Sequence, residues 1–178
     1  SVFARGSLPV PVYVSDLSLG ATNPVAVALT AVIHLVAGRC TATELLGLCA
    51  LAPIQQCLGL SEGDISTIDR WISDLHTTWG LDTDHRRIWL SDDFTEGTWA
   101  ASIDRLLMGA AMAAPSPRVG LDGIVPFDDV PTAGLRTAGL LAELIARLRV
   151  AHTATLGDHP IDYWVNALTN IARSLFAT

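Results

Sequence analysis

Residues 22–38 read TNPVAVALTAVIHLVAG, and this stretch decides the class of fold. Asn23 followed by Pro24 is typical of a helix start, because the Asn side chain can accept hydrogen bonds from the first free N–H groups and proline at the first helical position loses no hydrogen bond. The mainly apolar residues from Val25 to Ala37 then follow at helical spacing, and Gly38 is typical of a helix end. A membrane span needs about 20 apolar residues, so this shorter run predicts a buried helix.

Similar start and end signals divide the rest of the chain. Thr41 and Ser61 are each followed three residues later by an acidic residue, which is the pattern of a capping box. We expect further helices over residues 41–49, 53–59, 61–75, 99–114, 132–156 and 160–177. Residues 80–98 are rich in turn-forming residues, and residues 115–131 are expected to form a loop. The sequence therefore predicts an all-α fold, a compact bundle of about six helices.

The N-terminal residues follow a different pattern. Residues 8–14 read LPVPVYV, which is typical of a strand, and Pro9 and Pro11 restrict that strand to a sheet edge. No later segment has the pattern of a strong partner strand, so we expect either that the partner lies outside this chain or that the segment is a loose arm. The predicted organisation is an extended arm or strand over residues 1–16 and a helical domain over residues 17–178. Since the chain does not begin with Met, we expect it to be a fragment of a larger protein.

The composition excludes several chemistries. All 11 basic residues are arginine, so there is no lysine for a phosphate-binding loop or a Schiff base. The 18 acidic residues give a net charge of -7, which provides no overall attraction to nucleic acid or to an acidic membrane. The three cysteines match no zinc-binding spacing and are expected to be buried thiols of a cytosolic protein. We expect no catalytic residue, no cofactor and no metal ion.

Two acidic clusters raise the question of a metal site. Asp82, Asp84 and His85 lie close together in the sequence, but the closing Glu of a calcium-binding loop is missing. The aspartate pairs at 92–93 and 128–129 are a second candidate, for a two-metal nuclease site. Helix capping and loop solubility are the interpretations we favour for both. An enzyme that uses the groups of residues 82–93 remains one hypothesis, which a tightly bound divalent ion would support.

Tryptophan and arginine supply the remaining candidates. Trp89 follows Arg86 and Arg87 in a loop region, and these three residues form the candidate contact surface, because Trp and Arg are enriched at interfaces. Trp71 and Trp99 lie on the apolar faces of their expected helices and are predicted to pack in the core. The residues with an expected structural role are Asn23, Pro24, Trp71, Trp99 and Leu106.

Several motifs occur in an order that resembles a known family. They are VSDLSLGATNP at 14–24, APIQQCLGL at 52–60, TWGLD at 78–82, DRLLMGAAM at 104–112 and VPFD at 125–128. His85-Arg86 follows the third motif, and Tyr163-Trp164 is a late match. In this order and spacing they resemble the exodeoxyribonuclease V gamma subunit family, RecC, over roughly residues 8–177. The sequence departs from the family pattern at Gly97, where that family has Asn before Thr-Trp.

This resemblance implies a non-catalytic structural or DNA-handling module of the RecBCD helicase–nuclease, in double-strand-break repair and recombination. It implies the helical 2B subdomain of a superfamily-1-type helicase fold, with the N-terminal strand left from a parent α/β domain. The implied partners are the beta and alpha subunits, RecB and RecD, and the rest of its own subunit. DNA is a partner of the full complex, with weak or no binding by this piece. The implied location is the cytoplasm, without a membrane contact.

A second class of function stays open at this stage. Apolar helices and buried tryptophans could also line a pocket. The alternative is therefore a free-standing all-α domain that binds a small ligand or dimerises. A large closed cavity would favour that alternative.

Overall fold

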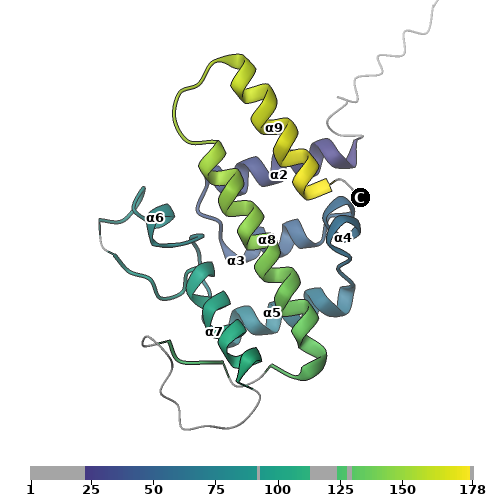
Figure 1. Ribbon diagram of the computed structural model, residues 1–178, viewed down its shortest axis with the longest axis vertical. Helices are drawn as coiled ribbons and strands as arrows, with labels where there is room; N and C mark the ends of the chain where they lie inside the picture. The colour runs from purple at the N-terminus through teal and green to yellow at the C-terminus, as the bar shows by residue number, and fades with distance from the viewer. Residues whose placement is uncertain (1–22, 92, 113–123, 128–129, 177–178) are drawn as a thin grey trace, which may run out of the picture.

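Figure 1 shows the computed structural model of the chain, which describes residues 23–91, 93–112, 124–127 and 130–176. The α-helices of these residues are α2 (Pro24–Ala37), α3 (Ala42–Cys49), α4 (Ala52–Leu58), α5 (Glu62–Asp74), α6 (Thr83–Arg86), α7 (Trp99–Ala111), α8 (Leu135–Ala154) and α9 (Ile161–Phe176). A 3-10 turn, η2 (Thr132–Gly134), precedes α8. The described residues contain no strand, which confirms the helical class. The strand expected over residues 8–14, and the arm over 1–16, lie outside the described residues.

The described residues hold eight α-helices, where the sequence predicted about six; the ranges expected above correspond to seven of the eight. The helix that the sequence missed is α6, in the turn-rich segment 80–98. It has four residues, and Asp82 caps it by accepting a hydrogen bond from the backbone N–H of His85 at 2.9 Å. A single capped turn has no apolar repeat, so periodicity does not reveal it.

Helix α8 is the central element of the bundle. It runs through the middle of the molecule in Figure 1, and α2, α5, α7 and α9 all pack against it. Its buried face includes Leu141, Leu144 and Leu148, which belong to one continuous hydrophobic core. Helix α8 therefore positions four of the other helices, while α3 and α4 pack against α2.

The helix starts follow the capping residues of the sequence. The Asn23 side chain accepts hydrogen bonds from the backbone N–H groups of Val25 and Ala26, at 2.9 and 3.3 Å, and Pro24 occupies the first helical turn. Thr41 and Ser61 each form a complete capping box. These local contacts satisfy N–H groups that an isolated helix leaves unpaired.

The core contains Trp71, Trp99 and Leu106, all of them fully buried. Trp99 also fixes the chain after α2, because its indole Nε1 donates a hydrogen bond to the Cys40 carbonyl oxygen at 2.8 Å. Burial raises the pKa of the Cys49 thiol to about 11, so this group stays protonated inside the core.

A close backbone crossing ties residues 124–127 to α7. The N–H of Phe127 donates to the Arg105 carbonyl at 3.0 Å, and Arg105 Nε donates to the Val125 carbonyl at 3.1 Å. Gly109 makes room for this crossing, since a Cβ at that position would lie 1.8 Å from the Phe127 carbonyl oxygen. Two motifs that are separate in the sequence, DRLLMGAAM and VPFD, therefore meet in space.

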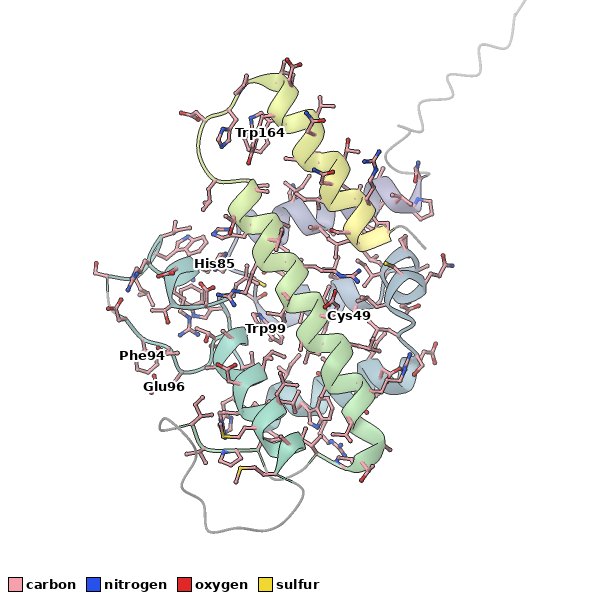
Figure 2. The ribbon with its side chains drawn as sticks, in the orientation of Figure 1. Cys49, His85, Phe94, Glu96, Trp99 and Trp164 are labelled. Atoms are coloured by element: carbon pink, nitrogen blue, oxygen red, sulfur yellow. The ribbon has the colours of Figure 1, made fainter. Side chains whose placement is uncertain are left out.

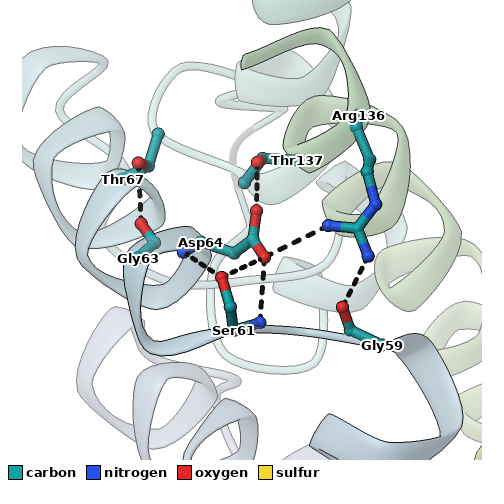
Figure 3. A network of polar contacts seen from close by, with 7 residues as sticks. All are labelled: Gly59, Ser61, Gly63, Asp64, Thr67, Arg136 and Thr137. Carbon is teal, nitrogen blue, oxygen red and sulfur yellow. Dashed lines mark hydrogen bonds and ion pairs between the residues drawn. The ribbon is translucent and has the colours of Figure 1, made fainter. Parts of the chain in front are cut away.

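A polar network joins the start of α5 to the start of α8 (Figure 3). Asp64 accepts hydrogen bonds from the Ser61 hydroxyl at 2.6 Å and the Thr137 hydroxyl at 2.5 Å, and the Arg136 guanidinium lies 3.2 Å away. Arg136 also donates to the Gly59 carbonyl at 2.6 Å. Burial alone would raise the pKa of Asp64, but these hydrogen bonds and the Arg136 charge lower it to about 2.

We predict that Asp64 makes the fold sensitive to acid. Its lowered pKa means that the carboxylate stabilises the folded state above its ordinary pKa of 3.8, and that this contribution disappears as the pH falls towards about 2. The contribution amounts to about 1–2 kcal/mol. Urea unfolding between neutral pH and pH 2 should show a smaller acid-induced loss for Asp64→Asn than for the wild type. Asp69→Asn, at an exposed position of the same helix, should keep the wild-type pH dependence.

A pair of glycine substitutions tests the crossing over α7. Gly109→Ala should lower the free energy of unfolding by about 1–3 kcal/mol, because the added Cβ forces two backbone segments apart. Gly139→Ala is the matched control, since Gly139 is an exposed helical position of α8 with nothing within 4 Å of an added Cβ. It should stabilise the helix by about 0.5–1 kcal/mol. Equal effects of the two substitutions in thermal unfolding would contradict the crossing.

Candidate functional site

The segment between α5 and α7 is held by one buried side chain, that of Arg86. Its Nε and Nη2 both donate to the Trp79 carbonyl, at 3.1 and 2.7 Å, and Nη2 also donates to the Thr78 hydroxyl at 3.4 Å. Its Nη1 donates to the carbonyls of Phe94 and Glu96, at 3.1 and 2.7 Å. Figure 2 shows Phe94 and Glu96 on the outer part of this segment, away from α8. One guanidinium therefore joins the two ends of the loop around α6.

Two glycines allow the backbone to close around Arg86. Gly80 has a φ of +85°, and a Cβ there would lie 2.7 Å from Arg86 Cγ. Gly97 has a φ of +70°, and a Cβ at that position would crowd the backbone carbonyl of His76. The guanidinium carbon also lies 4.8 Å from the centre of the Trp79 ring, within the range of a cation–π contact. The positive φ angles explain why glycine occupies both positions.

The prediction that Arg86 belongs to a contact surface is wrong. Its exposed fraction is 2%, because its donors are used by carbonyl groups of its own chain. Trp89 is only half-buried, but its ring packs against the rings of Trp79 and His85, with centres 6.0 and 5.2 Å apart. Arg87 is exposed, but it forms ion pairs with Asp84 at 2.5 Å and with another aspartate of the same loop. The three residues share a loop without forming one face.

A pair of histidines connects α6 to α8 and α2. The rings of His85 and His152 lie 4.5 Å apart, and His152 Nδ1 is 2.8 Å from the Val36 carbonyl oxygen. The N–H of Leu81 donates to His85 Nδ1 at 3.4 Å, whereas His85 Nε2 has no hydrogen-bond partner among the described residues. Burial and the neighbouring His152 lower the pKa of His85, which favours its neutral form. Figure 2 shows His85 between the outer loop and α8.

A groove of about 840 Å³ opens beside this histidine pair, between α6 and the corner where α8 leads into α9. We call it the α6–α8 groove. Its lining residues are Leu81, Asp82, Asp84, His85, Ile88, Ala146, Arg149, Val150, His152, Thr153, Ala154, Leu156 and Tyr163. Arg149 Nε and the Asp82 carboxylate form an ion pair across it at 2.8 Å. The groove is mainly apolar with one internal ion pair, which suits a binding surface better than acid–base chemistry.

The candidate metal clusters are placed as follows. Asp82 caps α6 and pairs with Arg149, while Asp84 is exposed and pairs with Arg87. Asp92 and the pair 128–129 lie outside the described residues. Within the described part of the chain, no group of three or more His, Cys, Asp and Glu residues could hold a metal ion. None of the described helices is long and apolar enough to cross a membrane.

Sequence reasoning missed the internal role of Arg86. Its side chain binds carbonyls up to ten residues away, and hydropathy carries no information about such contacts. The sequence signal that could have revealed this role is the combination of Gly80 and Gly97 on either side of a basic residue in a turn-rich segment. The residues TWGLD and His85-Arg86, which carried the family resemblance, meet around this guanidinium. The same motifs therefore serve to build the loop and the adjacent groove.

Comparisons with known proteins identify relatives. A family model described as the RecBCD enzyme subunit RecC fourth domain matches residues 22–178. The RecBCD enzyme subunit RecC of Mycobacterium tuberculosis (strain CDC 1551 / Oshkosh) is 34% identical over 157 residues, which are 88% of this chain and 14% of the relative. The subunit of Mycolicibacterium smegmatis is 34% identical over 158 residues, 89% of this chain and 14% of the relative. That of Escherichia coli K12 is 22% identical over 175 residues, 96% of this chain and 15% of the relative.

We predict that Arg86 is essential for the loop that bounds the groove. Arg86→Ala leaves buried carbonyls without donors and should lower the free energy of unfolding by about 3 kcal/mol. Arg86→Lys should recover only part of this loss, because one ammonium cannot reach the same set of carbonyls. Arg87→Ala, at the neighbouring exposed position, should change stability little. Urea unfolding followed by tryptophan fluorescence measures all three, and an unaffected Arg86→Ala would contradict the role.

Proposed function

The chain belongs to the RecC family of RecBCD enzyme subunits, as a RecC fourth domain, and we propose that it is a non-catalytic, protein-contacting module of that subunit. The observation that carries the proposal is the match of residues 22–178 to this domain family. The chain spans only 14% of the length of its mycobacterial relatives. In this proposal it works within a RecBCD helicase–nuclease in double-strand-break repair, with RecB, RecD and the rest of RecC as partners.

The use of the motif residues supports a structural role. Arg86 donates hydrogen bonds to backbone carbonyls of its own chain. Gly109 makes room for the crossing of residues 124–127, and Trp99 packs in the core and donates to the Cys40 carbonyl. A catalytic group needs access to a substrate. These residues are instead used to hold segments of the domain together, so we propose that ATP hydrolysis and nuclease chemistry belong to other parts of the complex.

The arginine pairing supports weak DNA binding by this domain alone. Among the described residues, Arg87, Arg136, Arg147 and Arg149 are paired with carboxylates. The described arginines that have no ion pair with a described carboxylate, apart from buried Arg86, are Arg39, Arg70, Arg105 and Arg173. They belong to separate parts of the fold, and strong phosphate binding needs a clustered basic face. We propose that the domain contributes to DNA handling mainly through its contacts with other domains.

The finer proposal is that the domain corresponds to the helical 2B subdomain of a superfamily-1-type helicase fold. The order of the sequence motifs and the all-α bundle are consistent with an inserted helical subdomain. The segment at residues 8–14 would then pair with a sheet of the parent α/β domain. An experimental structure of the whole subunit tests this placement directly, and a domain unconnected to a helicase-like α/β core would contradict it.

The test of the proposed function uses the complete parent subunit. It should co-purify with beta and alpha subunits as a stable complex, and failure to do so would overturn the proposal. Within that complex, the double substitution Arg70→Gln and Arg173→Gln removes two arginines that have no ion pair with a described carboxylate. We expect unchanged specific ATPase and nuclease activities and an unchanged affinity for forked DNA.

The salt dependence makes this test sharper. Each phosphate contact adds about 0.9 to the slope of log affinity against log salt. The double variant should keep the wild-type slope when fluorescence anisotropy is measured between about 50 and 200 mM salt. A slope reduced by about 1 or more would show direct phosphate contacts by this domain.

A further inference from the structure

Three strongly exposed apolar side chains of the described residues, Ile88, Val150 and Leu156, lie around the α6–α8 groove. We propose that this groove docks an apolar protein segment carrying Lys or Arg, supplied by the remainder of the RecBCD complex. The proposal rests on the function proposed above and names the chemistry of the partner. Its basis is the combination of three features: the apolar walls, the excess negative charge at the rim, and the rigid support beneath.

The walls carry large apolar groups that the described part of this chain leaves uncovered. Ile88 is 58% exposed, Val150 is 70% exposed and Leu156 is 48% exposed, and all three line the groove. They come from the loop after α6, the outer face of α8 and the connection to α9. A single exposed apolar residue needs no explanation, but such residues gathered around one groove mark an interaction site.

The apolar surface continues past Val150. This residue also borders a second depression, of about 370 Å³, between α8 and α9. That depression includes Ala151, Ala154 and Tyr163, and the last two also line the α6–α8 groove. An extended or helical segment laid over Val150 would therefore bury apolar surface on both sides of α8.

The charge at the rim favours a basic occupant. Arg149 is neutralised by Asp82, and the single charge of Arg87 lies beside the two carboxylates of Asp84 and Asp93. The Asp84 side chain is 82% exposed, so it remains available to a second cation. Asp158 adds a further negative charge in the same connection as Leu156. A basic side chain is attracted to this rim, whereas a phosphate backbone is repelled.

Contacts within this domain hold the walls of the groove in place. Arg86 fixes the loop that carries Ile88, and the contact between His85 and His152 holds α6 beside α8. A preformed apolar site does not need to be ordered during binding, so more of the interaction free energy contributes to affinity.

The experiment compares two single-cysteine substitutions in the assembled RecBCD complex. Val150→Cys places a thiol in the groove, and Val165→Cys places one on α9, at a position 58% exposed that is not among the lining residues of the groove. The alkylation rate with a maleimide is measured for both, with the wild-type complex as the background for the native cysteines. An occupied groove should slow alkylation at position 150 at least about tenfold relative to position 165. In denaturant the two rates should be equal.

A photo-reactive benzophenone attached to the new thiol of the Val150→Cys variant then identifies the occupant. We expect a cross-linked peptide that contains apolar residues together with Lys or Arg. Because these 178 residues contain no lysine, a lysine-bearing peptide must come from outside them. Equal alkylation rates in an assembled complex, or a cross-link to DNA or to an acidic peptide, would overturn the docking proposal. Failure of the subunit to assemble would instead contradict the proposed function, so the two failures are distinguishable.

Discussion

A buried guanidinium without a carboxylate partner among the described residues is the constraint on which the loop around α6 and the adjacent groove depend. Such a group is tolerated only when oxygen acceptors surround it, because removing an unpaired charge from water is costly. Arg86 meets this requirement with the carbonyls of Trp79, Phe94 and Glu96. The chain must therefore leave α5, turn through α6 and bring residues 94–96 back beside Trp79 before α7 begins. The position of α6, and with it one wall of the groove, follows from this closure.

Local signals explain why much of the fold was predictable. Asn23 caps α2 through N–H groups two and three residues away, and the Thr41 and Ser61 boxes are equally local. The burial of Trp71 and Trp99 follows from the apolar faces of their helices. In each case the interacting groups are close in the sequence or share one helical face, so the pattern of residues determines the contact.

The parts that the sequence did not reveal depend on distant contacts. Arg86, Arg87 and Trp89 are close neighbours in the sequence, and their chemistry alone suggested an exposed surface. Whether Arg86 is exposed depends on the return of residues 94–97, which periodicity does not describe. The groove likewise needs α6, α8 and the start of α9 together. A candidate site of this kind becomes visible only after the packing is known.

Several arginine side chains link separate segments of this domain. Arg105, Arg136 and Arg147 each donate to a backbone carbonyl of a different segment, those of Val125, Gly59 and Ser174 respectively. Arg136 and Arg147 bind a carboxylate at the same time. A planar guanidinium with five donors can make both contacts, whereas a lysine ammonium is a single point charge. These arginines therefore link segments of the domain, and counting them as free positive charge would overstate the attraction of this domain to DNA.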